Sequence, residues 1–185
     1  MNAPANPETL AKALRKCLAA IEGSGMKACA FGDFGAAGWG SKRAAAKVEL
    51  LVSSTEAQRD TLLGAVRGEG LRQAPGGGPL NLVFPDAKLG GEAPVDLIEA
   101  TTPFLKQVIT RAQPGAVVGV QVKVATFEDL ILQRAGSTAP SDVEIVIELL
   151  RGAAARIDGA YLKKEAEAAG TFAQLKTTWQ KAKSQ

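Results

Sequence analysis

A glycine-rich segment between two apolar stretches constrains the fold of this chain more than any other feature. The segment from Phe31 to Val52 reads FGDFGAAGWGSKRAAAKVELLV. It leaves a short apolar strand, passes through a basic stretch and enters a second strand. Each glycine in the interior of a helix costs about 1 kcal/mol relative to alanine. We therefore expect Gly32 to Gly40 to form a tight turn, followed by a short, closely packed helix.

The rest of the pattern predicts an α+β fold, with a mixed β-sheet of about five strands flanked by helices and a helical C-terminal segment behind it. We place the α/β core at residues 8–125 and the helical segment, packed on the core, at residues 126–185. The predicted strands are Lys27 to Phe31, Val48 to Val52, Leu80 to Phe84, Val95 to Ile98 and Ala116 to Val124. The predicted helices are Pro7 to Glu22, Thr55 to Arg67, Thr102 to Arg111 (helical or irregular), Thr126 to Arg134, Ser141 to Gly152, Asp158 to Ala169 and Thr171 to Lys183.

Composition excludes several classes of function. Of the 185 residues, 46% are hydrophobic and 22% are charged, which is typical of a globular protein. The net charge of +3, without a dense run of lysine or arginine, gives no strong signal for nucleic-acid binding. Histidine is absent, which excludes histidine-based general bases and most zinc sites. No apolar run is long enough to cross a bilayer.

The two cysteines, Cys17 and Cys29, are predicted to be small core residues in a reducing compartment. Residues Met1 to Pro7 lack the charged and apolar regions of a targeting peptide. We therefore expect a cytoplasmic protein that does not bind membranes. The oligomeric state stays open.

Three acids lie on or beside predicted strands: Asp33, Glu49 and Asp96. Side chains alternate along a strand, so Lys47 and Glu49 share one face. Two carboxylates on adjacent strands beside a glycine-rich turn would suit Mg²⁺, which prefers oxygen ligands and substrate phosphates. The alternative is that these charged residues simply face the solvent. The residues alone leave both interpretations open.

The order of the motifs resembles that of small bacterial nucleotidyltransferase-fold proteins related to the AbiEii-type toxins, in the DNA polymerase β-like superfamily. That family has a Gly-Gly turn, a small-residue helix, an Asp-x-Asp strand, a third Asp on a later strand and a Glu-Asp-Leu-Ile helix. The resemblance extends from about Leu10 to Lys181. The matching stretches are Gly32-Asp33, Ala36 to Gly40, Arg43, Lys47 to Val52, Val95-Asp96-Leu97-Ile98, Glu128-Asp129-Leu130-Ile131 and Asp142.

Departures from this pattern indicate a degraded metal-binding motif. The second glycine of the turn is Asp33, whose charge would repel a nucleotide phosphate. The first metal-binding Asp is Lys47, and the second is the longer Glu49, so that only Asp96 matches. Where the family usually has a lysine in the Glu-Asp-Leu-Ile helix, this chain has Arg134. We expect Lys47 either to pair with Asp33, Glu49 or Asp96 or to point into the solvent.

The resemblance therefore implies a nucleotidyltransferase-like protein with impaired catalysis, a pseudoenzyme that binds a nucleotide or a protein partner. One alternative is an active, toxin-like, Mg²⁺-dependent nucleotidyltransferase that modifies protein or RNA, with Glu49 and Asp96 as catalytic and metal-binding acids. Another is a regulatory or scaffold subunit that uses the old cleft as an interface. No cofactor is expected, except Mg²⁺ if the protein is active. The candidate nucleotide-binding residues are Gly32, Asp33, Ser41, Arg43 and Lys47.

A different role is open for Trp39, beside the glycine-rich turn. It could stack on a nucleotide base, but a core or lid position is more typical of a tryptophan.

Overall fold

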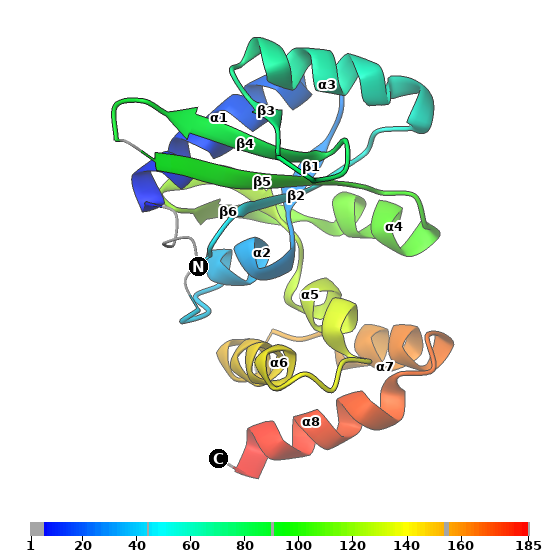
Figure 1. Cartoon of the computed structure of the whole chain (residues 1–185). Helices are drawn as coiled ribbons and strands as arrows, with labels where there is room; N and C mark the ends of the chain where they lie inside the picture. The colour runs from blue at the N-terminus through cyan, green and yellow to red at the C-terminus, as the bar shows by residue number, and fades with distance from the viewer. Residues whose placement is uncertain (1–5, 44, 90, 154–155, 185) are drawn as a thin grey trace.

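The computed structural model describes residues 6–43, 45–89, 91–153 and 156–184 and combines one β-sheet with eight α-helices in this part of the chain (Figure 1). In Figure 1, α1 and α3 lie above the sheet, and α4 lies below it. The helices α5 to α8 form a separate layer at the bottom of the view. The predicted α+β class is confirmed. None of the described helices is long and apolar enough to cross a membrane.

Over the residues that the structure describes, the sheet has seven strands in the order β3-β4-β5-β2-β1-β7-β6. The pairs β2–β5 and β1–β7 are parallel, and the other neighbours are antiparallel. The strands are β1 (Ala28–Ala30), β2 (Val48–Val52), β3 (Arg72–Gln73), β4 (Asn81–Asp86), β5 (Gly91–Glu99), β6 (Gln113–Val117) and β7 (Val120–Val124).

The predicted number of about five strands was too low, for two reasons. Strand β3 has only two residues, and both are exposed, so it carries no apolar pattern. The single strand predicted over Ala116 to Val124 is in fact part of a hairpin, formed by β6 and β7. Its turn has positive φ at both central residues, 46° at Val118 and 74° at Gly119. Such a turn matches the twist of a hairpin, but valine rarely adopts this conformation and gave no turn signal.

The helices agree with the predicted ones to within a few residues at their ends. Thr55 to Arg67 divides into a 3₁₀ turn (Glu56–Gln58) and a following α-helix. The α-helices are α1 (Pro7–Gly23), α2 (Gly32–Gly38), α3 (Arg59–Gly68), α4 (Pro103–Arg111), α5 (Phe127–Arg134), α6 (Pro140–Gly152), α7 (Gly159–Ala168) and α8 (Phe172–Ser184).

The short helix α2 packs against strand β1 as the glycine-rich segment predicted. A Cβ atom at Gly35 would lie 2.9 Å from the carbonyl oxygen of Ala30, so only glycine permits this approach. Trp39 ends the helix: its Nε1 donates a hydrogen bond to the carbonyl of Ala125 at 2.7 Å, and its ring stacks on Phe127 at 4.4 Å. Trp39 is thus a half-buried packing residue against the apolar core, in agreement with the predicted core or lid position.

Two apolar clusters form the core. The first contains α1, α3 and one set of sheet residues, among them Leu50. The second contains Leu51 together with residues of α4 to α8. Adjacent residues of β2 thus enter opposite clusters, as strand alternation requires. Because the second cluster holds residues from both sides of position 125, the helical layer and the sheet share it. The division into two units at that position stays a prediction.

Both cysteine thiols are expected to resist modification in the folded protein. Cys17 and Cys29 are free and fully buried, as predicted, and burial raises the pKa of each to about 12. A thiol reacts as its thiolate. An aromatic disulfide reagent at pH 8 should therefore react with neither cysteine in the native protein and with both in denaturant. Fast reaction of either cysteine in the native protein would contradict this burial.

The same shift gives a pH dependence of stability. The folded-state pKa values lie above the value of about 8.5 for an exposed thiol. The stabilisation from the protonated thiols is thus complete below about pH 8.5 and is lost as the pH rises towards 12. The free energy of unfolding, measured in urea between pH 8 and pH 10, should fall as the pH rises. Cys17→Ala and Cys29→Ala should each make this fall less steep.

Candidate functional site

Strands β2 and β5 bring two of the predicted acids together. The strands are parallel neighbours, and their register places Glu49 opposite Asp96. Lys47 comes just before β2, two residues from Glu49 and therefore on the same face. The structure thus gathers Lys47, Glu49 and Asp96 at one position on the sheet, next to the N-terminus of α2.

Lys47 pairs with both acids. Its Nζ lies 3.3 Å from Oε1 of Glu49 and makes a short hydrogen bond to Oδ2 of Asp96. Partial burial lowers the pKa of Lys47, but the hydrogen bond and charge of Asp96 and the charge of Glu49 raise it more, so the pKa lies above its ordinary value. The sequence left open whether Lys47 pairs with an acid or points into the solvent, and in the structure it is paired.

A residue that the sequence reasoning missed completes this contact. Asn81 on β4 donates from Nδ2 to Oδ1 of Asp96 at 2.7 Å, opposite Asp96 in the antiparallel register. Both carboxylate oxygens of Asp96 are therefore occupied, one by Lys47 and the other by Asn81.

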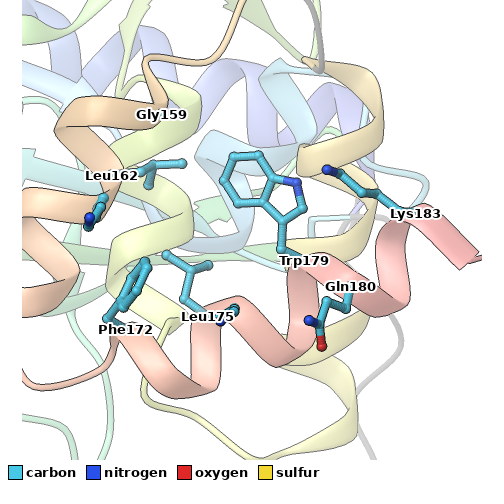
Figure 2. A pocket seen from close by; sticks show the side chains of 9 residues that line it. Gly159, Leu162, Phe172, Leu175, Trp179, Gln180 and Lys183 are labelled. Carbon is cyan, nitrogen blue, oxygen red and sulfur yellow. The ribbon is translucent and has the colours of Figure 1, made fainter.

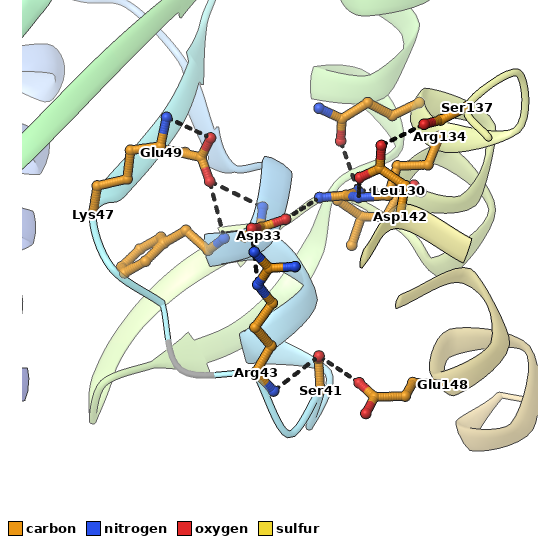
Figure 3. Close-up of polar contacts among 12 residues, drawn as sticks. Asp33, Ser41, Arg43, Lys47, Glu49, Leu130, Arg134, Ser137, Asp142 and Glu148 are labelled. Carbon is orange, nitrogen blue, oxygen red and sulfur yellow. Dashed lines mark hydrogen bonds and ion pairs between the residues drawn. The ribbon is translucent and has the colours of Figure 1, made fainter. Parts of the chain in front are cut away.

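The second oxygen of Glu49 caps helix α2. Oε2 accepts hydrogen bonds from the backbone N–H groups of Asp33 at 2.9 Å and Phe34 at 3.3 Å (Figure 3). These two donors have no partner within the helix. Gly32 makes the approach possible, because a Cβ atom there would lie 2.6 Å from Oε2 of Glu49. A side-chain carboxylate thus lies where the resemblance implied a nucleotide phosphate.

The acid of the turn is also paired. Asp33 Oδ1 accepts a hydrogen bond from Nη2 of Arg134 at 2.8 Å, and Nε of Arg43 lies 3.7 Å from Oδ2 (Figure 3). The Arg134 side chain is only 6% exposed, and its Nε lies 3.7 Å from Asp142 on α6. The charge of Asp33 in the turn is therefore compensated by the buried Arg134.

Ser41 is held by the helical layer. Its Oγ donates to Oε2 of Glu148 on α6 at 2.6 Å, and the same oxygen accepts from the backbone N–H of Lys42 at 3.3 Å. Of the predicted nucleotide-binding side chains, Ser41 is thus directed towards α6. Arg43 and Lys47 lie with Asp33 and Glu49 (Figure 3). Nothing in the sequence distinguished Glu148 from the other acids of that helix.

This arrangement does not fit a divalent metal ion. Within the described ranges, no group of three or more acidic or cysteine side chains is placed to hold a metal. The two acids that could ligate one, Glu49 and Asp96, have the Lys47 ammonium between them. A primary ammonium is a hydrogen-bond donor and cannot ligate a cation.

A second polar network, which includes none of the residues around Lys47, was not predicted. Asp129 on α5 is fully buried. One of its oxygens accepts from the Tyr161 hydroxyl at 2.8 Å, and the other accepts from Thr126 at 2.8 Å and lies 3.4 Å from Nε of Arg111. The Arg111 guanidinium also lies 3.8 Å from the centre of the Tyr161 ring. Burial, together with Asp129, raises the pKa of Tyr161. The network joins α4, α5 and α7.

Solved structures of nucleotidyltransferases resemble this fold. The solution structure of the antibiotic-resistance factor ANT(2'')-Ia aligns with a TM-score of 0.57 and 17% identity, covering 93% of this chain and 97% of that chain. A nucleotidyltransferase-like protein from Paracoccidioides brasiliensis, described as antigenic, aligns with a TM-score of 0.61 and 10% identity over 96% of this chain and 95% of that one. The chain has a nucleotidyltransferase-like fold.

A crystal structure of ANT(2'')-Ia in complex with adenylyl-2''-tobramycin also aligns with this nucleotidyltransferase-like chain, with a TM-score of 0.51, 17% identity and coverage of 84% of this chain and 93% of that one. No protein family model matches the chain, and no curated protein sequence matches it. At such low identities the likeness shows the fold. The predicted nucleotidyltransferase-like architecture is thereby confirmed, while the roles of the individual site residues stay predictions.

The contact between Gly32 and Glu49 can be tested by stability. Both Gly32 and Gly25 have left-handed backbones, with φ of 60° and 68°. A Cβ atom at Gly25 would meet nothing within 4 Å, whereas at Gly32 it would meet the Glu49 carboxylate. We expect Gly25→Ala to cost about 1 kcal/mol of unfolding free energy from backbone strain alone. Gly32→Ala should cost about 2 kcal/mol in urea titrations, and equal losses would refute the Glu49 contact.

Proposed function

We propose that this nucleotidyltransferase-like protein does not catalyse metal-dependent nucleotidyl transfer with its cleft and acts instead by binding a nucleotide or a protein partner. The supporting observation is the position of Lys47, whose Nζ pairs with both Glu49 and Asp96. In the family that the sequence resembles, an acid at position 47 would be a metal ligand. Kinship with the AbiEii-type toxins and a cytoplasmic location belong to the same proposal and rest on the sequence.

The electrostatics of the cleft support impaired catalysis. An ammonium about 4 Å from a divalent cation is repelled by about 8 kcal/mol at an effective dielectric constant of 20. Lys47 is partly exposed, and solvent screening reduces this figure. The loss of the ligand itself remains, because two-metal phosphoryl transfer needs acids that bridge both ions. Rotation of Lys47 away from the acids would remove the repulsion but would not supply a third carboxylate.

The internal pairing of the charges around Lys47 supports a role that needs no metal. Lys47 satisfies the acids of β2 and β5, Glu49 satisfies the N-terminus of α2, and Arg134 satisfies Asp33. Because these charges are matched within the protein, the arrangement needs no metal to hold it together. Arg43, at 51% side-chain exposure, is the most accessible of these cations and the best placed to meet an anionic ligand or partner.

A transfer assay tests the catalytic part of the proposal. The protein is incubated with each of the four labelled nucleoside triphosphates and Mg²⁺ or Mn²⁺, in the presence of protein and RNA acceptors. We expect no metal-dependent labelling. Labelling that disappears in Glu49→Gln, a variant that keeps a hydrogen-bond acceptor near α2, would instead establish the active, toxin-like alternative. The adjacency of Glu49 and Asp96 is the observation that favours that alternative.

Thermal unfolding separates the two kinds of binding. A ligand that binds only the folded state raises the melting temperature by mass action. A rise with a nucleoside triphosphate in the absence of metal, lost in Arg43→Gln, would indicate a nucleotide-binding role. A flat response to all four nucleotides would exclude that role and leave the protein-binding one, in which the cleft is an interface of a regulatory or scaffold subunit.

A further inference from the structure

A cavity in the helical layer lies apart from the ion-paired residues around Lys47. Its volume is about 390 Å³, and it opens between α7 and α8. Figure 2 shows the side chains that line it. These residues are Gly159, Leu162, Lys163, Phe172, Leu175, Lys176, Trp179, Gln180 and Lys183. None of them belongs to the group of ion pairs around Lys47.

The floor of this cavity is apolar. Leu162 and Leu175 are buried in the second core cluster, and Phe172 and Trp179 pack against that cluster from the open side. In Figure 2 the Trp179 indole and the Phe172 ring flank the Leu175 side chain. Two aromatic rings thus remain only partly buried beside the cavity. Such surfaces in clefts are typical of sites for small ligands.

All the charged residues that line the cavity, among those that the structure describes, are lysines. Three exposed lysines line it, Lys163, Lys176 and Lys183, and none of the lining residues is acidic. Lys163 has an exposed partner in Glu167 at 3.8 Å. Among the described residues, Lys176 and Lys183 have no ion pair. Helix α8 contains no acid at all.

We propose that this cavity binds a small amphipathic anion, an alkyl or aromatic carboxylate. The apolar body would lie on Phe172, Leu175 and Trp179, and the carboxylate would be held by Lys176 and Lys183 at the rim. The volume falls within the range of about 300–1,000 Å³ that is usual for small-molecule sites. A lysine ammonium attracts an anion as a point charge with three donors. The proposal is independent of the cleft and therefore of the proposed function.

Dodecanoate is a suitable probe, and Trp179 is an internal reporter. The chain has two tryptophans, and the other, Trp39, is stacked on Phe127. We expect dodecanoate to change the tryptophan emission with a sub-millimolar Kd, and dodecanol to bind at least about tenfold more weakly. Trp179→Phe should abolish the emission change. Displacement of anilinonaphthalenesulfonate, an aromatic anion, provides a second readout that does not depend on tryptophan.

Matched lysine variants test the role of the rim. Lys176→Gln/Lys183→Gln should weaken dodecanoate binding about tenfold or more. Lys164→Gln/Lys181→Gln removes the same charge from α7 and α8, at positions outside the lining residues, and should change binding less than about twofold. All four lysines are exposed, so that folding should survive in both variants.

Three outcomes would overturn the proposal. One is the absence of dodecanoate binding below millimolar concentration. Another is a loss of dodecanoate affinity that is equal in the two double variants, or an affinity for dodecanol equal to that for dodecanoate. In either case the rim lysines would contribute nothing specific to binding. The third is a concentration-dependent dimer, seen by sedimentation, that buries Trp179 and that dodecanoate does not dissociate. The cavity would then be an interface with a second copy of the chain.

Discussion

The Lys47→Asp variant is expected to bind Mn²⁺ or Mg²⁺ about 100-fold more tightly than the wild-type protein. The substitution removes the ammonium that pairs with Glu49 and Asp96, and it adds a third carboxylate at the same position. It converts a repulsion of several kcal/mol into an attraction, because Mg²⁺ and Mn²⁺ prefer oxygen ligands. Isothermal titration calorimetry with each metal, at constant ionic strength, provides the measurement.

Two control variants separate the ligand from the charge. Lys47→Met removes the ammonium without adding a ligand, and its metal affinity should rise by only part of the increase expected for Lys47→Asp. Lys42→Asp makes the same change of charge in the neighbouring exposed loop and should bind metal no better than the wild type. If all three variants bound metal equally, the effect would be one of net charge, and the interpretation of position 47 as a lost ligand would be wrong.

The Asp129→Ala variant is expected to lose about 3 kcal/mol of unfolding free energy, the largest loss of stability among these substitutions. Asp129 is fully buried and holds Tyr161, Thr126 and Arg111. Removal of one partner from a buried pair costs about 3–5 kcal/mol, because the remaining polar groups lose their partner. Since Arg111 is 28% exposed and can reach water, we take the lower end. The melting temperature should fall by between about 6 and 12 °C.

A double-mutant cycle assigns this loss to the network. Tyr161→Phe removes the hydroxyl that donates to Asp129, and its effect should not add to that of Asp129→Ala, with a coupling of about 1 kcal/mol. The exposed acid Asp60, in the first turn of α3, is a matched control: Asp60→Ala should cost less than about 0.5 kcal/mol. Full additivity of Asp129→Ala and Tyr161→Phe in urea titrations would show that the buried carboxylate acts without the tyrosine.

Local patterns in the sequence predicted the elements well, because strand alternation and helical spacing depend on neighbouring residues. They placed Lys47 and Glu49 on one face and identified the short helix after Gly32. Pairing between distant segments is a different matter. The hydrogen bond between Ser41 and Glu148 spans 107 positions and leaves no local trace. From the residues alone, carboxylates on adjacent strands beside the glycine-rich turn were one of two open interpretations, and the resemblance, through its third acid, favoured it for Asp96.

The same limit explains why the role of Asp129 was missed. An acid in the first turn of a helix is usually explained by the positive end of the helix dipole, and such residues are commonly exposed. Burial of Asp129 follows from Arg111 on α4 and Tyr161 on α7, which close over it from distant parts of the chain. The prediction for Glu49 was incomplete in a similar way. It treated the carboxylate as a possible metal ligand and did not consider that it could cap helix α2.

Because Glu49 caps α2, any other anion that binds the N-terminus of this helix has to compete with its carboxylate. A carboxylate tethered beside two backbone donors has an effective concentration in the millimolar range or above, because the chain holds it close to them. A phosphate from solution would have to exceed that concentration or displace Glu49. Its apparent Kd would rise in inverse proportion to the fraction of molecules in which the cap is open. The protein thus carries its own competitive inhibitor of anion binding at this turn.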